Sequence, residues 1–134
     1  MTEGTGQTAA SILVVEDNPA NQNLIKAVLL RDGYEVKIAG SAAAAIDSLR
    51  ESRPSLILMD VGLPDRDGLS LARQISSETH TASVPIVALT AHAMPGDREA
   101  ALAAGCVGYI TKPIDTRRLG ATVRSHLGNE ATLP

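Results

Sequence analysis

Five short apolar runs recur along the chain at fairly even spacing, and they limit the folds that it can adopt. The runs are rich in Val, Ile and Leu, as is typical of strands buried on both faces of a parallel sheet. They are SILVV from Ser11, YEVKIA from Tyr34, LILM from Leu56, PIVAL from Pro85 and VGYI from Val107. Helical patterns lie between them, so we predict a five-stranded α/β domain with parallel strands joined by right-handed crossovers and helices on both faces.

The intervals between the runs carry helix signals. Asn, Ser and Asp are favoured caps, and Pro is favoured at the first position of a helix. Gly128 is the expected end of the last helix. The expected starts of the first, second, third and last helices are Asn18-Pro19, Ser41, Asp67-Gly68 and the residues after Pro113.

The fourth helix, expected over residues 94–104, differs from the others because alanines dominate it. Only Met94 and Leu102 add larger apolar side chains to its expected buried face. Each alanine removes little apolar area from water, so this helix should be held weakly. Weak anchoring suits an element that moves.

Composition narrows the possible partners. The 134 residues carry a formal net charge of −3 with acidic and basic residues mixed, so the chain lacks the basic field that nucleic-acid binding requires. Tyr34 and Tyr109 are its only aromatic residues, too few for base stacking. We therefore expect no direct nucleic-acid partner.

The same composition indicates a cytoplasmic protein. No apolar stretch approaches membrane-spanning length, and the first ten residues lack the basic and apolar regions of a secretion signal. Cys106 is the single cysteine, which excludes an intramolecular disulfide. We expect its side chain to be buried as a small apolar group. We expect one domain over residues 11–128, with flexible tails at 1–10 and 129–134.

Polar residues follow four of the five apolar runs. In open parallel sheets, sites form beyond the carboxyl ends of the strands, so these residues should meet at one edge. Taken singly, each has an ordinary explanation as a loop acid, a strand-end cap or a solvated charge. The polar residues are Glu16, Asp17, Asp60, Thr90, Thr111 and Lys112, with Ala91 after Thr90 and Pro113 after Lys112.

Together, these residues point to phosphoryl transfer. Three clustered carboxylates repel one another unless a cation intervenes, and Mg²⁺ prefers such oxygen ligands. Lys112 would supply positive charge to a phosphoryl group, while the Thr90 hydroxyl and nearby backbone N–H groups would donate to its oxygens. A carboxylate would act as the nucleophile.

Four motifs in this order resemble the receiver domain of two-component response regulators. They are VVEDN at 14–18, LMDVGLPDRDG at 58–68, LTA at 89–91 and YITKP at 109–113. The resemblance implies a doubly wound, flavodoxin-like fold with strand order 2-1-3-4-5. It also implies that Asp60 accepts a phosphoryl group from a phosphohistidine on a histidine kinase or histidine phosphotransfer protein.

The resemblance implies roles for the other residues as well. Asp17, Asp60 and the Gly62 main-chain carbonyl would bind Mg²⁺, with Glu16 acting through water. Thr90, Ala91 and Lys112 would bind the phosphoryl group, Lys112-Pro113 would be a cis peptide, and Thr90 with Tyr109 would form a switch. A downstream protein would bind the face of the fourth helix, the fifth strand and the last helix.

Other functions stay open at this point. Gly62 replaces a side chain that many relatives carry, so we expect a short-lived phosphorylated state, with His92 as the other group near the path of water. An aspartyl phosphatase usually carries a second Asp where Gly62 stands, and no glycine-rich fingerprint follows the first run, which disfavours a nucleotide-binding module. The chain is not expected to turn over a separate substrate. A receiver excised from a hybrid histidine kinase is the remaining alternative.

Overall fold

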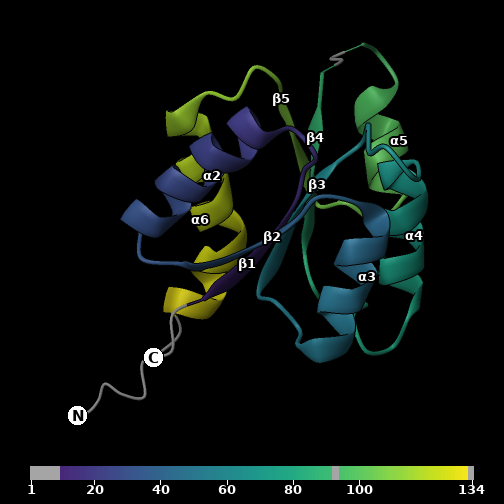
Figure 1. Ribbon diagram of the computed structural model, residues 1–134, viewed down its shortest axis with the longest axis horizontal. Coiled ribbons are helices and arrows are strands. Elements are labelled where there is room, and N and C mark those ends of the chain that lie inside the picture. The colour runs from purple at the N-terminus through teal and green to yellow at the C-terminus, as the bar shows by residue number, and fades with distance from the viewer. Residues whose placement is uncertain (1–9, 92–93, 133–134) are drawn as a thin grey trace.

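A five-stranded parallel sheet forms the centre of the molecule (Figure 1). The computed structural model describes residues 10–91 and 94–132, with side chains described as far as residue 127. The strand order is β2-β1-β3-β4-β5, which confirms the expected doubly wound topology. The strands are β1 (Ser11–Val15), β2 (Glu35–Ala39), β3 (Leu56–Asp60), β4 (Ile86–Thr90) and β5 (Gly108–Thr111).

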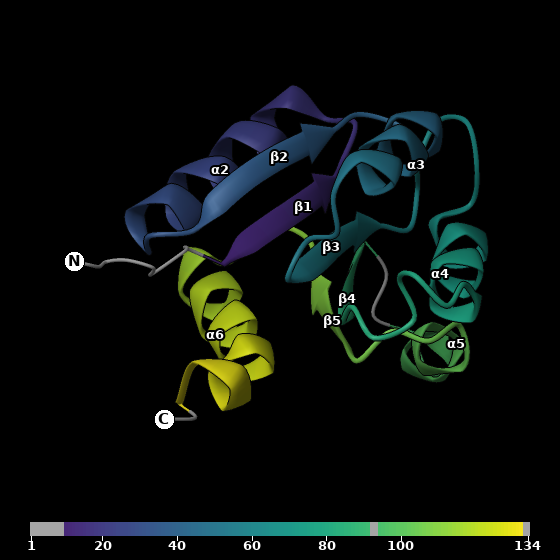
Figure 2. The same cartoon turned by 90° about the horizontal axis from the view of Figure 1, so that it is seen from below.

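Helices cover both faces of this sheet. Two of them, α2 and α6, lie on one face, and α3, α4 and α5 lie on the other (Figures 1 and 2). The helices are α2 (Pro19–Arg31), α3 (Ala42–Glu51), α4 (Gly68–Ser77), α5 (Asp97–Ala103) and α6 (Thr116–Thr132). Among the described residues, none of these helices is both long and apolar enough to cross a membrane.

The sheet separates two apolar cores. One lies under α2 and α6 and the other under α3, α4 and α5. All five residues of β3 and of β4 are buried, as are four of the five in β1, so these central strands have the two-sided burial that their sequences predict. The edge strand β2 instead alternates, with Glu35 and Lys37 exposed and Val36 and Ile38 partly buried.

The expected helix starts are confirmed by side-chain caps. The Asn18 side chain accepts a hydrogen bond from the Asn21 N–H, and Asp67 accepts one from the Leu69 N–H. The Ser41 hydroxyl oxygen likewise accepts from the Ala44 N–H at the start of α3. These caps fix where each helix begins after its strand.

Two expectations about helices are wrong. Met94 and Leu102 are 65% and 47% exposed, because α5 begins only at Asp97 and turns Ala101 inward. Gly128 does not end the last helix, which continues to Thr132. Glycine permits a helix to end but does not force it to.

Cys106 is buried in the core beside α5, as predicted for a small hydrophobe. Burial raises the pKa of its thiol to about 11, so the thiol stays protonated at neutral pH.

Gly68 brings the start of α4 against the end of β3. Its N–H donates to the Val61 carbonyl at 2.9 Å, which closes the base of the loop between β3 and α4. A Cβ at this position would meet the Asp60 carbonyl oxygen and would lie 2.8 Å from Val61 Cα. Only glycine fits such a close approach of two backbones.

Candidate functional site

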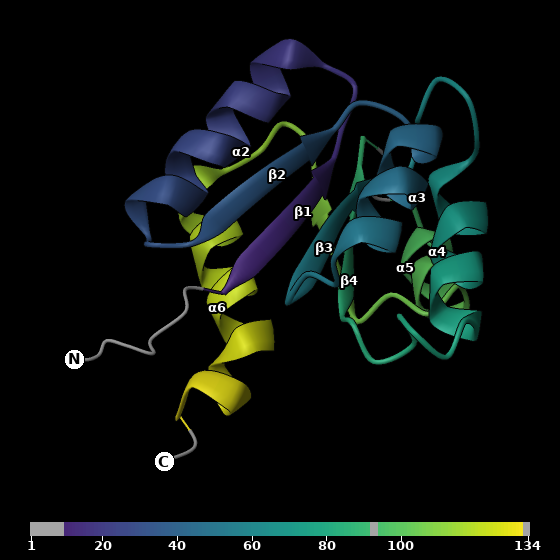
Figure 3. The ribbon, with the colours of Figure 1, turned by 60° about the horizontal axis from the view of Figure 1, so that its bottom comes forward.

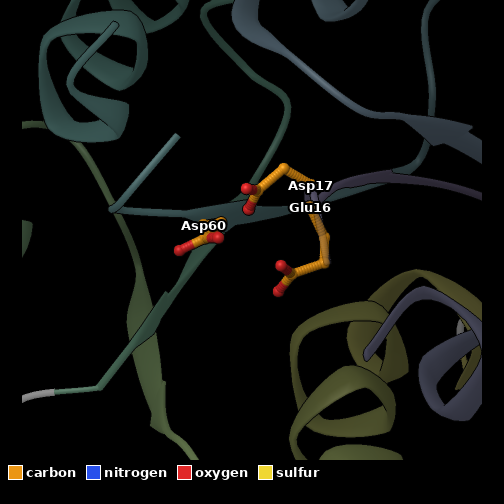
Figure 4. A group of neighbouring side chains, drawn as sticks. All are labelled: Glu16, Asp17 and Asp60. Atoms are coloured by element: carbon orange, nitrogen blue, oxygen red, sulfur yellow. The ribbon is translucent and has the colours of Figure 1, made fainter. Parts of the chain in front are cut away.

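Three carboxylates gather at the carboxyl end of the sheet. Glu16 and Asp17 follow β1, and Asp60 ends the neighbouring strand β3. Each side chain offers a carboxylate oxygen within 4.8 Å of the other two, and Figure 4 shows the three converging. Glu16 and Asp60 are buried, while Asp17 is exposed. Carboxylates this close require a compensating positive charge.

Lys112 supplies part of that charge from the end of β5. Its Nζ lies 2.9 Å from Glu16 Oε1 and 3.2 Å from Asp60 Oδ2. The Lys112 N–H donates to the Thr90 carbonyl at 2.7 Å, so the sheet ladder continues one residue past β5 and aims the side chain at the acids. The ammonium therefore bridges two of the three carboxylates.

Burial and the neighbouring charges act in opposite directions on the pKa values of Glu16 and Lys112. Burial raises the pKa of Glu16, and the nearby Asp60 charge adds to the rise, although Lys112 and the Asn18 N–H oppose it. Burial alone would lower the pKa of Lys112, but Glu16 and Asp60 outweigh it and the pKa is raised. Lys112 is thus held firmly in its charged form.

Backbone groups orient the Asp60 side chain. The Gly62 N–H donates to Asp60 Oδ1 at 2.9 Å, which leaves Oδ2 facing Lys112. The Val61 N–H donates to the Leu89 carbonyl and extends the pairing of β3 with β4 past the acid. Both carboxylate oxygens of Asp60 therefore have assigned partners.

Glu16 is fixed by contacts from the start of α2. Its Oε2 accepts from the Asn18 N–H at 3.0 Å, and its main-chain carbonyl accepts from Gln22 Nε2 at 2.6 Å. Sequence reasoning missed Gln22. The only available signal was its position in the first turn of a helix that starts immediately after the acids.

Thr90 lies at the end of β4, buried, and Ala91 follows it at the surface. Thr90 and the partly buried Tyr109 on β5 both line a pocket of about 50 Å³. The rest of the pocket lining comes from α4, α5, the middle of β4 and the residue after β3, namely Val61, Leu69, Ala88, Asp97, Ala100 and Ala101. His92 lies outside the described residues.

The peptide bond between Lys112 and Pro113 is cis, as the sequence resemblance implied. Across the whole site, the sequence placed the acids, Lys112 and Thr90 at the ends of separate strands. The structure brings these strand ends together at one edge of the sheet.

This arrangement belongs to a known class of signalling domain. The family model of the response regulator receiver domain matches residues 12–124, so the chain belongs to that family. It is a receiver domain of two-component signalling, and the resemblance seen in its motifs is confirmed.

Its relatives include both stand-alone regulators and kinase domains. The polar-differentiation response regulator DivK of Brucella anthropi is 39% identical over 89% of this chain and 97% of its own length. The receiver domain of a sensor histidine kinase from Pseudomonas aeruginosa, solved with magnesium coordinated in its active-site cleft, is 40% identical, with a TM-score of 0.82 over 90% of this chain and 99% of that one. The chemotaxis regulator CheY4 of Vibrio cholerae is 26% identical, with a TM-score of 0.85 over 90% of this chain and 100% of the CheY4 chain.

Proposed function

We propose that Asp60 is the phosphoacceptor and that it takes its phosphoryl group from a phosphohistidine on a histidine kinase or histidine phosphotransfer protein. The observation that carries this assignment is the contact of Asp60 Oδ2 with Lys112 Nζ at 3.2 Å, inside a cluster of three carboxylates. Asp60 is the last residue of β3, it is buried, and the Gly62 N–H orients its side chain, whereas Asp17 is exposed and Glu16 lies beyond the end of β1.

The transfer is a displacement at phosphorus. An Asp60 carboxylate oxygen bonds to phosphorus as the bond from phosphorus to the imidazole nitrogen breaks, and the nitrogen keeps the electron pair. Lys112 turns from its carboxylate partners to the phosphoryl oxygens, and the Thr90 hydroxyl and Ala91 N–H donate to them. No separate substrate is turned over, because the product stays on Asp60.

The acidic cluster suits Mg²⁺, since its donors are carboxylate oxygens in close reach of one another. Asp17, Asp60 and the Gly62 carbonyl would hold the ion, with Glu16 acting through a water. When bound, the ion supplies the positive charge that offsets the acids and the incoming phosphoryl group. The magnesium that the related histidine kinase receiver coordinates supports this assignment.

Thr90 and Tyr109 form the switch in this proposal. The Thr90 hydroxyl closes on the phosphoryl group, and the Tyr109 ring turns into the space lined by α4 and α5. The altered surface of α5, β5 and α6 then binds a downstream protein in the cytoplasm. Both a stand-alone regulator, as the likeness to DivK favours, and a receiver from a hybrid kinase are consistent with this chemistry.

The test is the intact mass of the protein after incubation with a small phosphodonor and Mg²⁺. Wild type should gain one phosphoryl group, while Asp60→Asn and wild type in excess chelator should gain none. Equal labelling of wild type and Asp60→Asn would refute the assignment of Asp60 as the phosphoacceptor. Undiminished labelling in excess chelator would refute the proposed metal site. Steady turnover of a small phosphate ester would instead favour a phosphatase.

A further inference from the structure

The loop that joins β3 to α4, residues 61–67, is tied to both helices beside it. The Asp65 side chain contacts the first turn of α3, and Figures 2 and 3 show the loop passing close to this helix. Asp65 Oδ1 accepts from the Ala42 N–H at 2.9 Å and its Oδ2 from the Ala43 N–H at 3.1 Å. The two oxygens of one carboxylate thus hold two successive N–H groups.

These bonds add to an α3 cap that is already present. Ser41 accepts from the Ala44 N–H, as an ordinary N-terminal cap does. Asp65 satisfies the two preceding N–H groups from 22 and 23 residues further along the chain. Its contacts therefore fix the loop on α3 as much as they stabilise the helix.

The next residue ties the loop to α4. Arg66 donates from Nη1 to the Gln74 side-chain oxygen at 2.6 Å and from Nη2 to the Ser70 carbonyl at 3.3 Å. Adjacent side chains therefore anchor the loop on opposite sides. The antiparallel bridge between Gly62 and Asp67 closes it at its base.

This loop carries the group that orients the acceptor. The Gly62 N–H is bonded to Asp60 Oδ1, and the Gly62 carbonyl is the proposed main-chain ligand of the metal. Gly62 has no side chain to pack, so its placement depends on the residues that hold the rest of the loop. A shift of about 1 Å in such a supporting group is enough to impair a reaction strongly.

We propose that Asp65 is a positioning residue, which holds the loop on α3 so that Gly62 is set for Asp60 and for Mg²⁺. This inference rests on the proposed function, because it deepens the assignment of Gly62. The two N–H groups hold the pKa of the Asp65 carboxyl below its usual value of 3.8, so the tie persists throughout the neutral range. Residues that orient metal ligands in this way commonly change metal affinity by tenfold or more.

The experiment measures Mg²⁺ binding by isothermal titration calorimetry and amide exchange of Gly62 by NMR in the metal-free protein. Asp65→Ala should weaken Mg²⁺ binding about tenfold and should speed exchange at Gly62. Asp65→Asn keeps one acceptor oxygen and should fall between Asp65→Ala and wild type. The exchange measurement matters because loss of a negative charge alone would weaken metal binding.

Two control variants separate positioning from simpler effects. Ser41→Ala removes the other cap of α3 and should lower stability without changing Mg²⁺ affinity or exchange at Gly62. Asp47→Asn removes an exposed charge from the same helix and should change neither.

Unchanged Mg²⁺ affinity and Gly62 exchange in folded Asp65→Asn would overturn the proposal, as would an equal effect of Ser41→Ala. Neither readout involves phosphate. Failure of Asp60 to accept a phosphoryl group would therefore count against the proposed function alone, and an inert Asp65 would count against this inference alone.

Discussion

Gly68→Ala should destabilise the protein strongly, because the added methyl group has no room. The new Cβ would meet the Asp60 carbonyl oxygen and would lie 2.8 Å from Val61 Cα and 2.9 Å from Asp60 C. All three are backbone atoms, so relief requires α4 to move away from β3. A flexible side chain could have turned aside at little cost, but a strand at the centre of the sheet cannot.

The size of the effect follows from two opposing terms. Overpacking typically lowers the free energy of unfolding by about 1–3 kcal/mol. The Cβ at position 68 would meet backbone atoms, which cannot turn aside, so we take the upper value of about 3 kcal/mol. Alanine regains at most about 1 kcal/mol of helix propensity, and less at the first position of a helix. The net loss in free energy of unfolding should be about 2–3 kcal/mol. For a chain of this size that corresponds to a fall in Tm of about 8–12 °C.

Urea denaturation followed by circular dichroism measures the change, and Gly62→Ala is the matched control. Gly62 lies in the loop that leads to Gly68 and lacks a positive φ, and a Cβ there would meet only Asp60 Oδ1, at 3.8 Å. The free energy of unfolding of Gly62→Ala should stay within about 0.5 kcal/mol of the wild-type value. A Gly68→Ala protein as stable as this control would refute the argument from close approach.

Three further predictions concern the site. Folding raises the pKa of Glu16 above its usual 4.5, so ionisation of Glu16 opposes folding, and the stability of metal-free wild type relative to Glu16→Gln should fall as pH rises from 4.5. Gly62→Met should slow loss of phosphate from Asp60 after donor removal, because its side chain would shield the approach of water and the backbone at Gly62 permits it. Hydrogen exchange should change most in α5 and around Tyr109 on phosphorylation, since only Ala101 of α5 is fully buried.

Each of these has a contrary result. If the free energies of unfolding of wild type and Glu16→Gln changed with pH in parallel, folding would not raise the pKa of Glu16. A folded Gly62→Met protein that loses phosphate as fast as wild type would show that access past this residue does not set the lifetime. Protection changes confined to α2 and α3 would contradict a switch that acts through α5.

The strand ends could be predicted from the sequence because apolar runs stop abruptly at polar residues. Asp60 follows four buried apolar residues of β3, and Lys112 follows β5, so each marks the end of its strand in the sequence itself. Parallel strands then bring these ends to one edge. The order 2-1-3-4-5, however, comes from the family resemblance, since pairing between distant strands leaves no local signal.

The failures have a common cause. In an alanine-rich helix many faces are nearly equivalent, so the sequence could not show that Ala101 and not Leu102 turns inward on α5. The contact of Asp65 with Ala42 and Ala43 joins a loop to a helix across 22 and 23 residues, and neither periodicity nor turn composition reports such a contact. Sequence patterns describe neighbours along the chain, whereas these features depend on packing.

The alternation along β2 has a consequence for behaviour at high concentration. An edge strand presents backbone N–H and C=O groups to which a strand from another molecule can add. Glu35 and Lys37 occupy the exposed positions of β2, one acidic and one basic. A second chain that extended the sheet would crowd and partly desolvate both charges, so the pattern that turns Val36 and Ile38 inward also guards the domain against aggregation through this edge.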